Sequence, residues 1–69
     1  MYTVYAKNHA NTVEFEETYL ELDLALTTYK TARKCEDCAS VGLMDALTGE
    51  ILKDWDYYKG EWISPSFKK

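Results

Sequence analysis

The sequence predicts an α+β fold in which a small antiparallel sheet of three or four strands carries one long helix on one face. A helical repeat of apolar residues runs through residues 18–38, and stretches of strand-like alternation lie before and after it. In the later stretch Leu47, Thr48 and Gly49 separate two apolar runs, as is typical of a β-hairpin. A chain of 69 residues accommodates one compact domain, 1–69, and we expect residues 66–69 to fray.

The first segment, residues 2–6, alternates with a period of two and is rich in aromatic and β-branched residues, which predicts a strand. Tyr2, Val4 and Ala6 then face one way, and Thr3 and Tyr5 face the other. Residues 7–11 are rich in turn formers, and residues 12–15 alternate again. We therefore expect either a short second strand or an extended approach to the helix.

The central helix has an apolar face and charges that suit both of its ends. Thr18 and Glu21 have the spacing of a capping box, which satisfies backbone N–H groups at a helix start. Lys30, Arg33 and Lys34 lie near the other end, where the helix dipole favours cations, and we expect the helix to stop between residues 34 and 38. At about 100° per residue, one arc of roughly 140° holds the face expected to be buried, formed by Tyr19, Leu22, Ala25, Leu26, Tyr29 and Ala32.

A second, narrower stripe lies on another side of the same helix. Leu20 and Leu24 share it with Thr27, Thr31 and Cys35. One interpretation is that the sheet edge or the C-terminal tail folds over this stripe. The other is that the stripe contacts another protein.

The hairpin segments span residues 39–46 and 50–58, and Gly49 supplies the left-handed backbone that a hairpin loop requires. Val41 and Leu43 share a face of the first segment. On the second, Ile51 and Trp55 share a face with Lys53 between them, although Leu52 competes with Ile51 for the buried position. Gly60 then turns the chain, and residues 61–63 are expected to form a short strand that ends at Ser64-Pro65.

The charge balance limits the classes of partner. Twelve acidic and eight basic groups give a net charge of −4, which disfavours direct binding to nucleic-acid phosphates or an anionic membrane and allows a basic partner. No apolar run is long enough to span a membrane, and the N-terminus lacks the pattern of a secretory signal. We expect a cytosolic protein.

No motif predicts a reaction, so we expect no enzyme, cofactor or metal site. Cys35 and Cys38 form a C-x-x-C pair, but they lie near a helix C-terminus with two carboxylates between them, which raises the pKa of a thiol. A zinc site needs two more ligands, and His9 is the sole histidine. The simplest interpretation makes both cysteines packing residues and His9 an exposed loop residue.

The carboxylates are the strongest candidates for function. Glu14 and Glu16, if extended, form an i, i+2 pair, as do Asp54 and Asp56, and a strand places such pairs on one side about 6.6–6.8 Å apart. This interval is comparable with that of charges along a nucleic-acid backbone. Aromatic residues lie among the second pair, in the segment WDYYKGEW at 55–62. The alternative is that these acids only keep a small protein soluble.

Acids beside aromatic residues suit a basic protein surface, because tyrosine and tryptophan pack on arginine stems while carboxylates pair with guanidinium groups. Stacking on a nucleic-acid base is the alternative, but acidic neighbours repel phosphates. We therefore predict a partner-binding surface, with no direct nucleic-acid contact, formed by Glu14, Glu16, Asp54, Asp56, Tyr57 and Tyr58.

Two segments carry a resemblance to known proteins. They are the helix start Thr18-x-x-Glu21 and the hairpin SVGLMDALTGEILKDW, whose turn at residues 45–50 reads D-x-x-T-G-E. In size, acidity and element order the chain resembles small accessory proteins of bacteriophages and mobile elements, including the acidic anti-CRISPR inhibitors. The resemblance implies a non-enzymatic inhibitor that mimics DNA and covers the basic groove of a host defence complex. It transfers no functional residue.

Two other hypotheses remain from the sequence. In the first, the chain is a structural or regulatory dimerising module that uses Leu20 and Leu24, so that a monomer or weak homodimer is expected. Alternatively, it depends on a metal or on thiol chemistry at Cys35 and Cys38, within one chain or between two copies.

Overall fold

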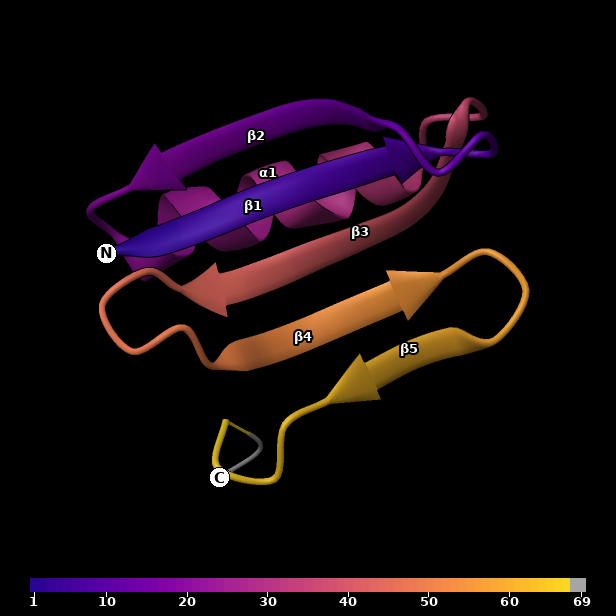
Figure 1. Ribbon diagram of the computed structural model, residues 1–69. Coiled ribbons are helices and arrows are strands. Elements are labelled where there is room, and N and C mark those ends of the chain that lie inside the picture. The colour runs from indigo at the N-terminus through magenta and orange to yellow at the C-terminus, as the bar shows by residue number, and fades with distance from the viewer. Residues whose placement is uncertain (68–69) are drawn as a thin grey trace.

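In the part of the chain that the structure describes, five strands, numbered β1 to β5 in chain order, form one antiparallel sheet in the order β2-β1-β3-β4-β5, shown in Figure 1. The computed structural model describes residues 1–67. Along the chain the elements are β1 (Tyr2–Asn8), β2 (Val13–Tyr19), α1 (Leu22–Arg33), β3 (Cys38–Asp45), β4 (Ile51–Asp56) and β5 (Gly60–Ile63). The N-terminal strand β1 lies inside the sheet, between β2 and β3.

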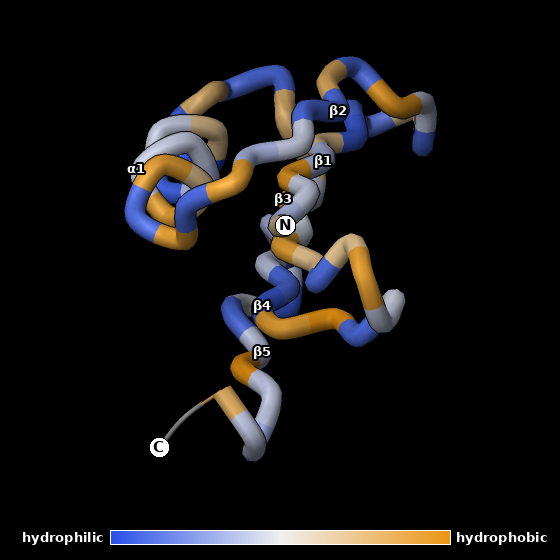
Figure 2. The backbone as a smooth tube through the Cα atoms, turned by 90° about the vertical axis from the view of Figure 1, so that its left-hand side faces the viewer, coloured by the Kyte–Doolittle hydropathy of each residue, from blue (hydrophilic) through white to orange (hydrophobic). Residues whose placement is uncertain are grey.

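The single described helix lies on one side of the sheet, and Figure 2 shows it beside β1, β2 and β3 and away from β5. The predicted α+β class is confirmed. The prediction of three or four strands is wrong, because residues 13–19 and 60–63 both pair as strands. The prediction of a long helix is also wrong, because α1 has only 12 residues.

The helix is shorter than predicted because β2 takes the residues assigned to its first turn. Thr18 and Tyr19 pair with Thr3 and Tyr2 of β1, and the Oγ1 atoms of the two threonines lie 2.9 Å apart. Glu21 is the N-cap residue of α1, but it makes no side-chain capping hydrogen bond. The capping box is therefore wrong, since pairing with β1 satisfies the backbone of residues 13–19 in another way.

The core lies between α1 and the central strands. Ala25 and Tyr29 of the helix are fully buried, and they pack in a cluster with Val4, Val41 and Leu43 of the sheet. The predicted inner face of the helix is thus confirmed for Ala25 and Tyr29, with Leu22, Leu26 and Ala32 partly buried around them, whereas Tyr19, predicted for the same face, lies in β2. Residues Tyr19 and Phe15 of β2 also pack against this core.

The β3–β4 hairpin is present as predicted, and Gly49 adopts a φ of 78° in its loop. A shift in register between Leu43 and Met44 leaves Leu52 without a partner on β3, and Leu52 is the buried residue in place of Ile51. Pro65 follows β5 as expected. Of the tail, Ser66 donates a hydrogen bond to Glu50 at 2.8 Å and Phe67 packs against the core, whereas residues 68 and 69 lie outside the described part.

The packing on the sheet face opposite the helix depends on one close contact between two strands. Tyr5 and Gly42 are cross-strand partners, and a Cβ atom added at Gly42 would overlap the Tyr5 ring. The glycine therefore lets the tyrosine lie flat across β3 toward β4. The Tyr5 ring thus covers the centre of this face, although α1 packs on the opposite face.

Replacing Gly42 with alanine is expected to lower the free energy of unfolding by about 1–3 kcal/mol, because the new Cβ displaces the Tyr5 ring. Urea denaturation of Gly42→Ala, with Ser40→Ala on the same strand as the control, measures this loss. In a Tyr5→Ala background the additional cost of Gly42→Ala should largely disappear. Equal stability of Gly42→Ala and the parent protein would contradict the contact.

Candidate functional site

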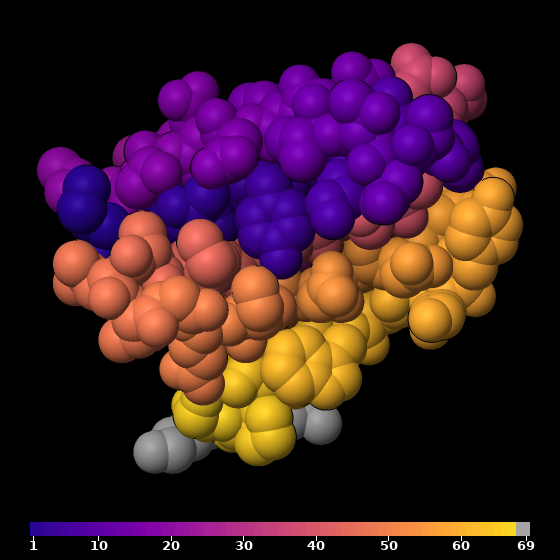
Figure 3. Space-filling model, in the orientation of Figure 1, coloured from indigo at the N-terminus to yellow at the C-terminus, as the bar shows by residue number. Residues whose placement is uncertain are grey.

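One cross-strand row organises the sheet face that α1 does not cover. Glu16, Tyr5, Gly42, Asp54 and Trp62 follow one another as partners across all five strands. Asp56 lies two residues beyond Asp54 and therefore on the same side. We call the surface formed by Tyr5, Lys7, Glu16, Asp54, Asp56 and Trp62 the open face, and Figure 3 shows the molecule from this side.

The carboxylates of the open face have no ion pair with any residue of the described chain. The two salt bridges found within residues 1–67 both involve Glu61, which lies on the other side of the sheet. Partial burial, followed by the negative charge of Asp56, raises the pKa of Asp54, and Lys7 offsets part of this effect. Burial and the charge of Asp54 likewise raise the pKa of Tyr5.

Asp56 has a structural role as well as a charge. Its Oδ1 atom accepts hydrogen bonds from the backbone N–H groups of Tyr58 at 2.8 Å and Lys59 at 3.1 Å. These bonds hold the turn that leads into β5, in the manner usual for aspartate. The side chain is therefore fixed where the open face meets the β4–β5 turn.

Aromatic rings gather at this turn. Tyr57 and Tyr58 are 59% and 76% exposed, and their ring centroids lie 5.1 Å apart. The His9 ring packs edge-on against both, at 5.6 Å from Tyr57 and 6.2 Å from Tyr58. We call His9, Tyr57 and Tyr58 the aromatic corner. Sequence analysis missed His9, because 49 positions separate it from Tyr58 and no local pattern joins them.

Glu14 does not share the open face, so the prediction that Glu14 and Glu16 lie on one side is wrong. The pairing register shifts between Phe15 and Val13, which leaves Glu14 as an extra residue in a β-bulge. Glu14 instead lines a cavity on the helix side, together with Phe15. The other predicted residues, Glu16, Asp54, Asp56, Tyr57 and Tyr58, lie on the open face or at the aromatic corner.

Glu61 shows how the same chain treats a carboxylate that serves the fold. Its Oε2 atom accepts hydrogen bonds from Tyr29 Oη at 2.9 Å and Arg33 Nη1 at 3.0 Å, and Lys53 Nζ lies 4.0 Å away. The Arg33 guanidinium also lies 5.8 Å from the Trp55 ring centroid. This cluster ties the end of α1 to β4 and β5.

The two cysteines are free, with Cys35 exposed and Cys38 buried. Burial is the main reason that the pKa of Cys38 rises to about 11, and Cys35, Glu14 and Asp37 raise it further. At neutral pH this sulfur is therefore a thiol and a weak nucleophile. Within residues 1–67, no three histidine, cysteine or acidic side chains come together as a possible metal site.

Neither family models nor curated proteins nor solved structures gave a match to this chain. The helix within residues 1–67 lacks the length and apolar character needed to cross a membrane.

The replacement Asp54→Asn is expected to raise the melting temperature at pH 7. The pKa of Asp54 is higher in the folded than in the unfolded protein, so the folded state binds its proton more tightly and loses stability as pH rises through the titration of this carboxyl. The amide removes that loss. Thermal melts at pH 3 and pH 7 measure the effect, and the advantage of Asp54→Asn should shrink at pH 3.

The control for this prediction is Glu17→Gln, which removes one negative charge from an exposed position on β2. If Glu17→Gln and Asp54→Asn change the melting temperature equally at both pH values, the effect comes from net charge and the local explanation fails.

Proposed function

We propose that this chain is a non-enzymatic binding protein whose open face covers a basic, nucleic-acid-binding surface of a partner protein. One observation carries the proposal: Glu16, Asp54 and Asp56 share one uncovered sheet face, without ion pairs inside residues 1–67 and beside exposed aromatic rings. Partial burial and the neighbouring Asp56 raise the pKa of Asp54 and so disfavour its charged form. If Asp54→Asn raises the melting temperature as predicted above, the carboxylate is more readily explained by binding than by folding.

The geometry also suits such a partner. Glu16 and Asp54 are three strands apart, or about 14 Å, while Asp54 and Asp56 are about 6.6–6.8 Å apart along β4. The negative charges therefore cover the width of the face instead of one edge. The accessible surface of the molecule is 4706 Å², so the roughly 800 Å² that one side of an ordinary protein interface buries is less than a fifth of it.

Aromatic and charged groups would contribute to binding in different ways. Trp62 on the open face is 51% exposed, and Tyr58 at the aromatic corner is 76% exposed, so both offer area for packing on arginine stems. The carboxylates would mainly accelerate association through long-range attraction and exclude acidic partners. Glu14 is not part of this surface, because the β-bulge directs it elsewhere.

Within this class we favour an inhibitor of a host defence complex, of the phage type that the sequence resembles, acting in the host cytosol. Such an inhibitor would compete with nucleic acid for the same basic groove. The acidic open face supports competition with nucleic acid, whereas the assignment to defence rests on the resemblance alone.

Neutralising the open face is expected to abolish capture of a nucleic-acid-binding protein. The triple variant Glu16→Gln, Asp54→Asn, Asp56→Asn keeps the shape of each side chain, and asparagine at position 56 keeps the oxygen that holds the turn. Immobilised parent chain should capture such a protein from bacterial lysate, added DNA or RNA should displace it, and the triple variant should retain at most about a tenth.

The matched control is Asp23→Asn, Glu36→Gln, Asp37→Asn, which removes three negative charges outside the open face and should leave capture unchanged. The proposal fails if the captured protein is not displaced by nucleic acid. It also fails if both triple variants bind as the parent chain does.

A dimerising module is the second candidate, and one observation favours it. Leu20 and Leu24 are 77% and 54% exposed, so neither the sheet edge nor the described tail covers them. Apolar side chains at this exposure are common contact points between copies. If they form a dimer, sedimentation at rising concentration should show it, and Leu24→Lys should shift the midpoint at least tenfold. A monomer at every concentration would eliminate this candidate.

A further inference from the structure

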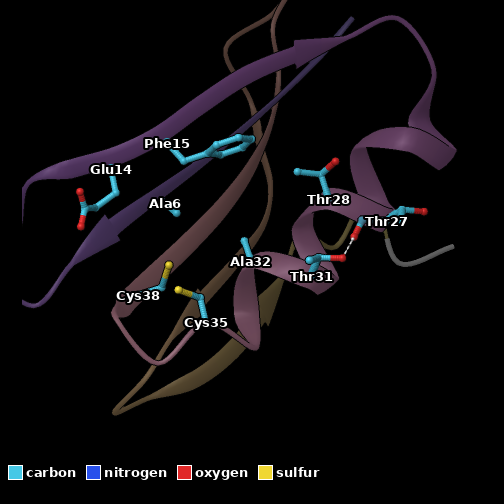
Figure 4. A pocket seen from close by; sticks show the side chains of 9 residues that line it. All are labelled: Ala6, Glu14, Phe15, Thr27, Thr28, Thr31, Ala32, Cys35 and Cys38. Carbon is cyan, nitrogen blue, oxygen red and sulfur yellow. Dashed lines mark hydrogen bonds between the residues drawn. The ribbon is translucent and has the colours of Figure 1, made fainter.

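A hollow lies between β2 and α1, on the helix side of the sheet and away from the open face. The hollow has a volume of about 430 Å³. Figure 4 shows Phe15 pointing from β2 toward the helix, with Thr28, Thr31 and Ala32 on the opposite wall and the sulfurs of Cys35 and Cys38 side by side at one end. Its lining includes Thr27, Thr31 and Cys35, which belong to the second stripe of the helix.

The helix wall is apolar although it contains several threonines. The Oγ1 atom of Thr27 donates a hydrogen bond to the backbone oxygen of Asp23, and that of Thr31 donates to the backbone oxygen of Thr27, both at 2.9 Å. The hydroxyl protons of Thr27 and Thr31 are thus used within the helix. The surface left for a bound side chain consists mainly of methyl groups and the ring of Phe15.

One side of this hollow is an open sheet edge. β2 is the first strand in the sheet order, and among residues 1–67 it pairs only with β1. Its seven residues contain no proline. Within the described chain, no backbone hydrogen bond joins Val13–Tyr19 to any segment beyond β1. Alternate N–H and C=O groups of an edge strand point outward and can accept another strand.

We propose that an extended, basic segment of a partner protein adds to the free edge of β2 and inserts an apolar side chain into the hollow. Backbone pairing would supply general affinity, and the hollow would select the inserted side chain. At about 430 Å³ the hollow holds one large aliphatic or aromatic side chain. The site does not depend on the proposed function, because it lies on the other side of the sheet.

Charge identifies the segment as basic. β2 reads VEFEETY, so Glu14, Glu16 and Glu17 flank or alternate with Phe15 along the edge. Glu17 pairs with Val4, whereas Glu16 pairs with Tyr5, so carboxylates stand on both sides of the strand. Lysine or arginine on an added strand would meet them at cross-strand distance.

The same charges disfavour a second copy as the occupant. Pairing β2 with β2 would bring the glutamates of two chains together, and like charges on neighbouring strands destabilise a sheet. Charged side chains on an edge strand are a common device against self-association. They repel an identical edge while attracting a basic one.

The probe for this proposal is the capped hexapeptide of alternating lysine and valine, followed by NMR on the isotopically labelled full chain. Backbone amides of Val13–Tyr19 and side-chain methyls of Thr28 and Ala32 should shift on titration. The same peptide with every backbone nitrogen methylated keeps its charges and side chains but cannot donate, and it should bind at least tenfold more weakly. The glutamate–valine hexapeptide should not bind.

Thr31→Arg places a long cationic side chain at the exposed rim of the hollow and should weaken binding of the lysine–valine peptide at least tenfold. Thr48→Arg adds the same charge in the β3–β4 loop and should leave binding unchanged. An unchanged strand-amide spectrum confirms that each variant is folded.

Four results would each overturn the proposal. These are equal binding of the methylated peptide, no effect of Thr31→Arg, shifts confined to the open face, and concentration-dependent shifts of β2 without peptide, which would make a second copy the occupant. A failure here leaves the open-face test intact, although Glu16 belongs to both surfaces. The open-face test replaces Glu16, Asp54 and Asp56 and measures capture of a nucleic-acid-binding protein, whereas this test replaces Thr31 and measures peptide binding.

Discussion

A helix of 12 residues has to cover a sheet of five strands, and this mismatch decides most of the structure. Such a helix is about 18 Å long and about 10 Å wide, whereas five strands about 4.8 Å apart span about 19 Å. α1 therefore buries the central strands and leaves the others to be closed in different ways. Tyr29 and Ala25 form its contact with the core, and both are fully buried.

Where α1 does not reach, polar and aromatic groups cover the sheet on the helix side, whereas the open face has little cover. Beside α1, Glu61 gathers Tyr29, Arg33 and Lys53, and this cluster extends the cover over β4 and β5. On the open face, Tyr5 lies across Gly42, and the neighbouring acids face solvent. Glu61 is thus paired within the fold, whereas Glu16, Asp54 and Asp56 have no ion pair inside residues 1–67, which makes the open face the natural candidate for a partner.

Local patterns in the sequence predicted the features that depend on neighbouring residues. The alternation of Val4 and Ala6, the helical spacing of Ala25 and Tyr29, and the glycine in the β3–β4 loop each record one local requirement. The capping box failed because Thr18 has a better partner in Thr3, fifteen positions away. A pairing of that kind leaves no mark on the local sequence.

The candidate site was predictable only in part for the same reason. Asp54, Asp56, Tyr57 and Tyr58 are close in sequence, so their proximity followed from a single strand and turn. Glu14 was misplaced by a bulge, since one extra residue in a strand reverses the side on which its neighbours lie. His9 joins the aromatic corner, and Phe15 the hollow, only through the order of strands in the sheet.

The internal place of β1 has a consequence for the order in which the chain can fold. The β1–β2 hairpin can form as soon as both strands exist, but the other edge of β1 stays unpaired until β3 is available. Met1 accepts a hydrogen bond from Ala46, so the two ends of this pairing are 45 positions apart along the chain. During synthesis, β1 can therefore pair with β3 only after residues 38–45 have left the ribosome, and pairing of segments so far apart in the chain is slow to form.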